Sequence, residues 1–252
     1  LDRLCERAEA AVAGVYNIII LSDRQAGQDK IAIPSLLATA AVHHHLIRKG
    51  LRTSVGLVVE SAEPREIHHF CLLAGYGAEA INPYLAFDSL LDMHARGEMP
   101  KEVDDKEVVY RYIKSIGKGI LKVMSKMGIS TYQSYCGAQI FDAIGLSSDF
   151  VAKYFTGTAT TIEGVGLDEI AEETVRRHTS AFSNDPVLTS TLEFGGEYAV
   201  RLRGESHVWS SETVSTLQHA VRTGSFATFG EYSKLVNRET ARAQTIRGLF
   251  KI

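Results

Sequence analysis

Hydrophobic positions along the first 182 residues follow two spacings that alternate with each other. Apolar residues three or four apart predict helices over residues 1–13, 36–49, 64–74, 84–96, 108–127 and 167–182. Short apolar or β-branched runs predict strands over residues 15–21, 53–60, 79–81 and 129–135, with a further helix opening at Gly137. Strands and helices that alternate through short connections are typical of parallel sheets with right-handed crossovers.

This alternation predicts an α/β domain over residues 1–182, in which helices flank parallel strands. An open sheet and a barrel both fit the pattern, and periodicity does not decide between them. Gly14 is expected to end the first helix in a left-handed conformation.

The character of the sequence changes after the last of these helices. Residues 183–186, Ser-Asn-Asp-Pro, form a turn cluster, and the glycine- and aromatic-rich residues 194–209 predict a β-hairpin or an irregular arm. Two short helices are predicted over residues 212–222 and 229–237. The chain starts inside a helical pattern and ends without a closing element, so we expect a piece of a longer polypeptide, with residues 183–252 as a connection.

Composition and charge narrow the possible functions. The 252 residues include 27 basic and 30 acidic side chains, so the net charge of -3 gives no electrostatic reason to bind nucleic acid. No apolar run approaches the roughly 20 residues that cross a bilayer. The three cysteines form no C-x-x-C pair and read as reduced thiols. We therefore expect a cytoplasmic protein with neither a nucleic-acid nor a membrane partner.

Four polar residues stand where the first three strands end. They are Asp23, Arg24, Glu60 and Asn82. In parallel α/β folds ligands bind at the carboxyl ends of strands, so these side chains predict a strand-end pocket. The alternative, which we favour, is that they cap helices or pair with one another, Asp23 with Arg24 or Arg52 and Glu60 with Arg65.

Other candidate residues have weaker signals. The run His43-His44-His45 invites a metal interpretation, but neighbouring helical side chains point about 100° apart and do not converge on one ion. Helix packing is the more common role of buried histidine. Cys136 lacks an adjacent base that would make it a nucleophile. The stripe Lys118, Lys122 and Lys126 has the spacing of a solvated helix face.

Several long blocks of the sequence resemble the central region of the glutamate synthase large subunit, and the resemblance extends from the first residue to the last. The blocks are 33–38, 41–48, 65–70, 75–78, 82–86, 121–131, 137–141, 154–158, 204–207 and 217–221. The longest reads Leu-Lys-Val-Met-Ser-Lys-Met-Gly-Ile-Ser-Thr over residues 121–131. Ordered matches of this length are far more specific than a short motif.

The resemblance implies a multidomain enzyme. Its amidotransferase domain releases ammonia from glutamine, and its FMN domain, with an iron-sulfur cluster, adds the ammonia to 2-oxoglutarate to give glutamate. The central region is similar to a degenerate, TIM-barrel-like relative of the FMN domain and holds the two active sites in register. Residues 183–252 then lead toward the FMN domain, and a small electron-donating subunit or ferredoxin is an expected partner. The resemblance places FMN and the cluster in the parent enzyme and no cofactor in this chain.

The catalytic pieces of that family are not found in this sequence, so no catalytic, cofactor or metal residue is carried over. The sequence also departs from the family pattern at Ala62, Cys136 and Thr161, where we expect a glycine and two arginines. A glutamate-synthase-like homologue with altered activity is therefore an alternative. Two others are a stand-alone α/β-barrel enzyme that binds a flavin or a phosphorylated ligand and a metal-dependent hydrolase built on the histidines.

Overall fold

The computed structural model describes residues 1–100, 102–138, 140–182 and 207–241. The predicted turn at 183–186, most of the predicted arm at 194–209 and the last residues, 242–252, lie outside the described residues. The chain divides into two compact units, Leu1–Ser183 and Asn184–Ile252, which are described separately.

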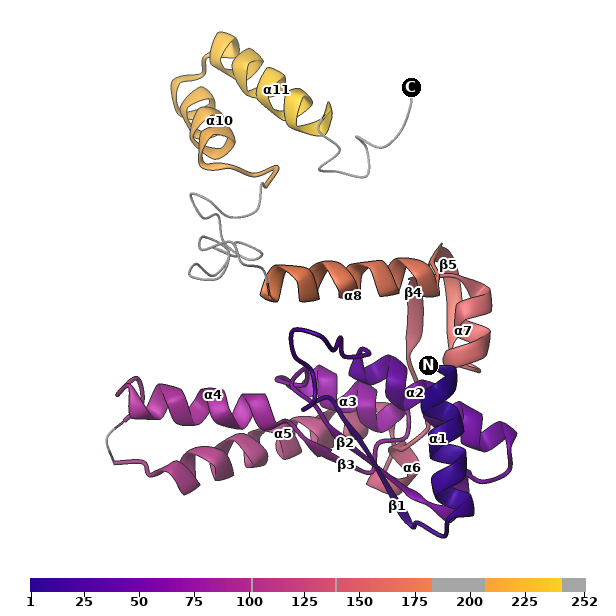
Figure 1. The fold of residues 1–252 in the computed structure, drawn as a ribbon. Coiled ribbons are helices and arrows are strands. Elements are labelled where there is room, and N and C mark those ends of the chain that lie inside the picture. The colour runs from indigo at the N-terminus through magenta and orange to yellow at the C-terminus, as the bar shows by residue number, and fades with distance from the viewer. Residues whose placement is uncertain (101, 139, 183–206, 242–252) are drawn as a thin grey trace. The chain divides into compact units, whose positions relative to one another are not determined.

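The first half of unit 1 repeats a helix-strand pattern (Figure 1). Its elements are α1 (Asp2–Ala13), β1 (Ile18–Ser22), α2 (Ser35–Arg48), a 3-10 turn (Arg52–Ser54), β2 (Gly56–Glu60), α3 (Ile67–Gly75) and β3 (Ala80–Asn82). The helices and strands predicted here are confirmed, with ends that shift by a few residues. The left-handed residue after α1 is Val15, with φ 65°, whereas Gly14 has φ -78°, so that part of the prediction was wrong.

The three strands form one parallel sheet in the order β1-β2-β3. The right-handed crossovers through α2 and α3 step in the same direction, so they place both helices on one face of the sheet. Ile19, Leu57 and Val59 are buried under that face. Ile18 and Ile20 point the other way, and each is 62% exposed. Helices α2 and α3 therefore cover one face of the sheet, and Ile18 and Ile20 lie exposed on the other.

The second half of unit 1 differs more from the prediction. Its elements are α4 (Tyr84–Ala95), α5 (Asp105–Met127), α6 (Tyr132–Tyr135), β4 (Asp142–Leu146), α7 (Ser148–Tyr154), β5 (Ala159–Val165) and α8 (Leu167–Ala181). The predicted strand at 129–135 was wrong: Gly128 ends α5 with φ 71°, and the Thr131 hydroxyl accepts the Ser134 N–H at 3.3 Å and starts the short helix α6. No helix opens at Gly137, since the chain runs on to β4.

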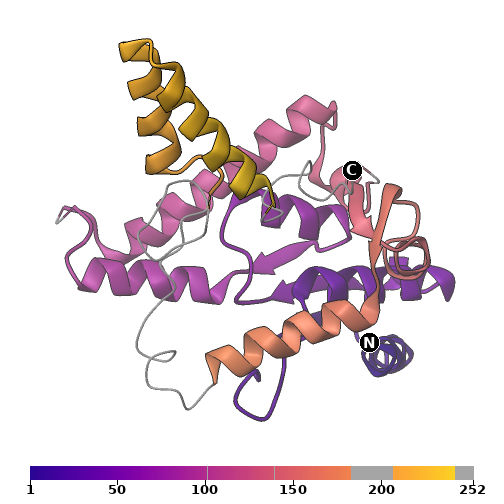
Figure 2. The same ribbon diagram turned by 90° about the horizontal axis from the view of Figure 1, so that it is seen from above.

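Figure 1 shows α4 leaving the sheet and the start of α5 lying beside it, and Figure 2 shows that α5 then diverges from α4. The later part of α5 packs on α3. Phe87 of α4 packs edge to face on Tyr112 of α5, with ring centroids 5.8 Å apart. The Asp104 carboxylate caps α5 by accepting the Glu107 N–H at 2.8 Å. Capping and aromatic packing together define this helical pair.

The expectation of a TIM-barrel-like domain is not confirmed. In the described part of the chain, the strands form a three-stranded sheet and a separate two-stranded parallel sheet of β4 and β5, and neither closes. The coarser prediction of an α/β domain with short parallel strands and flanking helices is confirmed.

The main core lies between α1, α2, the sheet and α7. Val42 and Leu46 of α2 are fully buried there, with Leu57 of β2 beneath them. Tyr76 packs on Phe155 with ring centroids 5.1 Å apart, and its hydroxyl lies 2.6 Å from the Thr158 hydroxyl. This core joins the two halves of unit 1.

Unit 2 contains a helical hairpin of α10 (Ser211–Thr223) and α11 (Phe226–Ala241). The Ser210 hydroxyl accepts the Thr213 N–H at 3.2 Å, and Gly224, with φ 63°, ends α10. Both predicted helices are confirmed and are longer than expected. Across the described residues, each helix is too short or too polar to cross a lipid bilayer.

Candidate functional site

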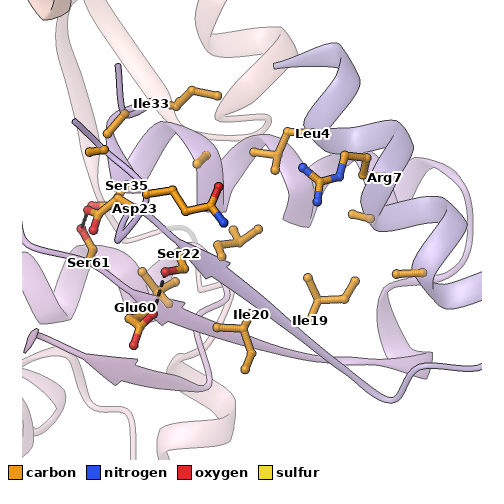
Figure 3. Close-up of a pocket in the computed structure, with 18 of the residues that line it drawn as sticks. Leu4, Arg7, Ile19, Ile20, Ser22, Asp23, Ile33, Ser35, Glu60 and Ser61 are labelled. Atoms are coloured by element: carbon orange, nitrogen blue, oxygen red, sulfur yellow. Dashed lines mark hydrogen bonds between the residues drawn. The ribbon is translucent and has the colours of Figure 1, made fainter. Parts of the chain in front are cut away.

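The polar residues predicted at the strand ends lie together in the structure. Because the sheet is parallel and in register, Ser22, Glu60 and Asn82 form one row across the ends of β1, β2 and β3. Asp23 and Arg24 follow directly after β1. Figure 3 shows Ser22 and Glu60 joined by a hydrogen bond, and Asp23 joined to Ser61.

Glu60 is the centre of this row. Its carboxylate accepts hydrogen bonds from Ser22 Oγ at 2.6 Å, Arg24 Nε at 2.8 Å and Asn82 Nδ2 at 3.2 Å. The hydrogen bond from Ser22, followed by the one from Arg24, lowers the pKa of the Glu60 carboxyl. Glu60 therefore stays ionised and holds the three strand ends together.

Asp23, the first residue after β1, is the second acceptor in this cluster that receives several hydrogen bonds. Its carboxylate accepts hydrogen bonds from Ser61 Oγ at 2.6 Å, from the Ala62 N–H at 3.0 Å and from Tyr84 Oη at 2.7 Å. Burial, and then the bond to Asp23, raises the pKa of the Tyr84 phenol to about 12. The Arg24 guanidinium lies 4.1 Å from the centroid of the Tyr84 ring and connects the two acceptors.

The four predicted residues are thus brought together, but their partners differ from those expected. Arg24 pairs with Glu60 and Arg52 with Glu79. The carboxylates of Glu60 and Asp23 both accept their hydrogen bonds from other groups of the protein. The cluster is therefore suited to fixing the strand ends and lacks a free acid or base directed at a ligand.

A groove of about 640 Å³ lies beside this cluster, along β1. Leu4 and Arg7 of α1 lie on one side of it and Ile33 on the other, with Ile19, Ile20 and Ser22 of β1 between them (Figure 3). Ala8 and Ile31 also line it. The groove is mainly apolar and runs parallel to the strand.

Arg52 organises a buried polar cluster at the amino-terminal ends of β2 and β3. Its side chain is 13% exposed and donates to His43 Nδ1 at 3.0 Å, the Val55 carbonyl at 2.7 Å, and the Gly77 carbonyl at 2.9 Å. It also donates to Glu79 Oε1 at 3.0 Å. This network ties the turn after α2 to the turn before β3.

The three consecutive histidines have different surroundings: His43 accepts a hydrogen bond from Arg52, and His44 is buried beside the rings of His43 and Tyr76. Burial is the main cause that lowers the pKa of both His43 and His44 to about 4, so both are neutral at pH 7. His45 Nε2 lies 2.9 Å from Glu9 Oε2 and joins α2 to α1. The described residues contain no group of three or more His, Cys, Asp or Glu side chains placed to hold a metal ion.

The positions that depart from the family pattern fall in different places. The Ala62 N–H donates to Asp23 inside the cluster, and Thr161 lies exposed on β5. The Cys136 thiol lies 3.6 Å from the Ala78 carbonyl oxygen, and burial raises its pKa. Cys136 is therefore a protonated thiol at neutral pH.

Ser61 and Tyr84 were not predicted as members of the strand-end cluster, and Ser22, at the end of the first predicted strand, was given no partner. The register of the sheet could have indicated Ser22. When parallel strands end at the same edge of a sheet, the last residues of neighbouring strands lie side by side. That rule places Ser22 beside Glu60. Tyr84 has no such signal, since its contact with Asp23 depends on how α4 leaves β3.

Comparison with known proteins identifies similar sequences. The profile of the family described as "Glutamate synthase central domain" matches residues 1–147. The large chain of NADPH glutamate synthase from Bacillus subtilis is 46% identical over 99% of this chain, which covers 16% of that relative. NADH glutamate synthase of Schizosaccharomyces pombe is 39% identical over 99% of this chain, which covers 12% of it. The chloroplastic ferredoxin-dependent glutamate synthase 2 of Arabidopsis thaliana is 40% identical over 94% of this chain, which covers 15% of it. The chain therefore spans a small part of each relative.

Proposed function

The chain belongs to the glutamate synthase central-domain family, and from this membership we propose that it is the linking domain of a larger glutamate synthase. In that enzyme, glutamine and 2-oxoglutarate, with two electrons from a reductant and two protons, yield two glutamates. The domain holds the amidotransferase and FMN domains in register and performs no chemistry itself. Residues 1–182 form the domain proper, and residues 183–252 lead toward the FMN domain.

One observation supports the non-catalytic role: the carboxylates of the strand-end cluster accept hydrogen bonds from other groups of the protein. In an α/β domain this edge is where a catalytic site is expected. Here Glu60 and Asp23 each accept three hydrogen bonds from the protein, so neither is directed at a substrate. The cluster stabilises the sheet edge from within.

Two observations on the described residues support placing the cofactors of the proposed enzyme in other domains. Iron-sulfur clusters are held by grouped cysteine thiolates, whereas Cys5, Cys71 and Cys136 each have a pKa raised by burial, and the described residues form no group of three or more metal-binding side chains. A flavin phosphate needs free N–H groups at a helix start. At α2 the Ser35 N–H already donates to Glu63 Oε2 at 2.7 Å. FMN and the cluster are therefore assigned to other domains.

The relatives differ in the electron donors that their names give, NADPH, NADH and ferredoxin, and the linking role that we propose does not depend on which donor the larger enzyme uses. An electron-donating subunit or ferredoxin is thus a partner of the larger enzyme. The free thiols fit a reducing compartment, and we assign the protein to the cytoplasm.

Two preparations test this function. The purified 252-residue chain, given glutamine, 2-oxoglutarate and dithionite, is expected to form no glutamate. The native polypeptide that carries the chain is expected to form glutamate under the same conditions. Turnover by the isolated chain, or none by the native polypeptide loaded with its cofactors, contradicts the proposal.

A further inference from the structure

The outer edge of β1 has backbone groups without partners in the sheet. The Gly56 N–H donates to the Asn17 carbonyl at 2.9 Å, and the Asp23 N–H donates to the Glu60 carbonyl at 3.2 Å. Backbone direction alternates along a strand, so the odd-numbered residues from Asn17 to Asp23 face β2. The N–H and C=O groups of Ile18, Ile20 and Ser22 therefore point to the open edge.

The side chains on this strand are also unusually apolar for an edge. Ile18 and Ile20 are each 62% exposed on the face without helices. Natural sheets protect open edges with lysine, proline, a bulge or a covering element. The sequence Ile-Ile-Ile-Leu-Ser of β1 has neither lysine nor proline, and its pairing with β2 is regular.

The groove gives this edge a shape that fits an extended segment. All five residues of β1 line the groove, together with residues of α1 and residues 31–33, and its inner end reaches Ala38 of α2 and Val59 of β2 (Figure 3). Arg7 and Lys30 line it, and within the described part of the chain neither has a carboxylate partner. A matching occupant is apolar and carries an acidic side chain.

The arrangement of the helices indicates the direction that a strand added to the open edge of β1 would take. α1 packs beside α2, and α2 packs beside α3. Each of these helices leads into the next strand, and α2 and α3 each connect two neighbouring parallel strands. By the right-handed crossover rule, a strand connected through α1 lies parallel to β1 on its open edge.

We propose that β1 accepts a parallel strand, apolar and bearing a carboxylate, from elsewhere in the larger polypeptide. This inference rests on the proposed function, because it requires a larger polypeptide. The added strand extends the sheet to four strands, places backbone partners on Ile18, Ile20 and Ser22, and brings a carboxylate to Arg7 and Lys30. It makes the linking role rigid, since the domain and its neighbour share one sheet.

Hydrogen exchange compares the open and occupied edges directly. Residue-resolved exchange is measured in the 252-residue chain and in the native polypeptide that carries it. We expect the amides of Ile18, Ile20 and Ser22 to exchange about a hundredfold more slowly in the native polypeptide. The amides of Leu57 and Val59, inside the sheet, are the control and are protected in both. Equal exchange of the β1 amides in both preparations overturns the proposal.

A proline variant tests the same edge chemically. Ile20→Pro removes an N–H that points away from β2, so the isolated chain should keep its fold. In the native polypeptide the same change should raise exchange along β1 about tenfold. Leu21→Pro, which removes an N–H directed at β2, is the matched control and should destabilise both preparations. If Ile20→Pro does not fold, the exchange comparison of the unaltered proteins decides alone.

Two further outcomes separate the alternatives. Protection of β1 in the isolated chain that rises with protein concentration shows that a second copy occupies the edge, and it overturns the proposal. Glutamate formation by the native polypeptide is measured in parallel. Turnover with an unprotected β1 rejects the added strand alone, whereas a protected β1 without turnover rejects the proposed enzyme function.

Discussion

Replacing Arg52 with methionine tests the buried network that joins α2 to β3. The side chain is 13% exposed and donates to two backbone carbonyls, His43 Nδ1 and Glu79. Methionine has a similar length and no donor, so the change leaves buried acceptors without partners. Each unsatisfied buried acceptor costs about 1–3 kcal/mol, and part of the network stays solvated at Glu79. We expect the free energy of unfolding of unit 1 to fall by about 4 kcal/mol.

The loss is measured by urea denaturation, followed through the amide exchange of α2 and β2. These elements report unit 1 directly, whereas the sole tryptophan, Trp209, lies in unit 2. The matched control is Arg176→Met on α8, because Arg176 is 76% exposed and its ion pair within the described part of the chain is with Glu172 on its own helix. That surface change should cost less than about 0.5 kcal/mol. A loss below about 1 kcal/mol for Arg52→Met refutes the network as a major source of stability.

Four other changes test separate parts of the structure by the same urea assay. Gly77→Ala should lower the free energy of unfolding by about 3 kcal/mol, since Gly77 has φ 102° and an added Cβ meets the His43 ring. Gly50→Ala should lower it by about 1 kcal/mol, since Gly50 has φ 69° but open space around it. Equal costs contradict the close approach to His43. Val15→Gly should stabilise the chain by about 1 kcal/mol, because Val15 is 83% exposed and holds φ 65°; a loss of stability shows that the strain is absent. His44→Leu should stabilise by about 1 kcal/mol, because His44 Nε2 is buried without a hydrogen-bond partner among the described residues; a destabilised variant means that this nitrogen has one. The pKa of His43 and of His44 falls from an ordinary 6.5 to about 4 on folding, so stability should be full above pH 6.5 and fall as the pH drops toward 4, and His44→Leu should reduce that slope. An unchanged slope places the pH dependence elsewhere.

Parts of the first half of the fold follow from the sequence because β2 and α2 bury many of their residues. β2 alternates buried and half-buried residues from Gly56 to Glu60, and α2 buries most of its length, so both leave strong apolar patterns. β4 and β5 leave no such pattern, because most of their residues are exposed or half-buried. Hydrophobic periodicity detects only elements with a buried face. β4 and β5 are held by backbone pairing with each other, so periodicity did not predict them.

The strand predicted at 129–135 shows the opposite error. Its β-branched and aromatic residues have strand propensity, but Tyr135 is fully buried against Cys71 and Met124 from a short helix. Tertiary packing of that one side chain, together with the Thr131 cap, outweighs the local preference. The candidate site was predictable in composition and not in detail. Strand order brings Asp23, Arg24, Glu60 and Asn82 together, whereas their partners depend on rotamers and on the path of α4.

We propose that this domain aligns catalytic centres in other domains and has none of its own. The most direct test of this proposal is the kcat for glutamate formation by the native polypeptide carrying Glu60→Gln, with the melting temperature measured on the same sample. Glutamine keeps the shape and an acceptor oxygen but cannot act as a base. The account predicts a kcat within about threefold of the unaltered enzyme. A fall of about a hundredfold or more at an unchanged melting temperature would show that Glu60 takes part in the chemistry and would contradict the account.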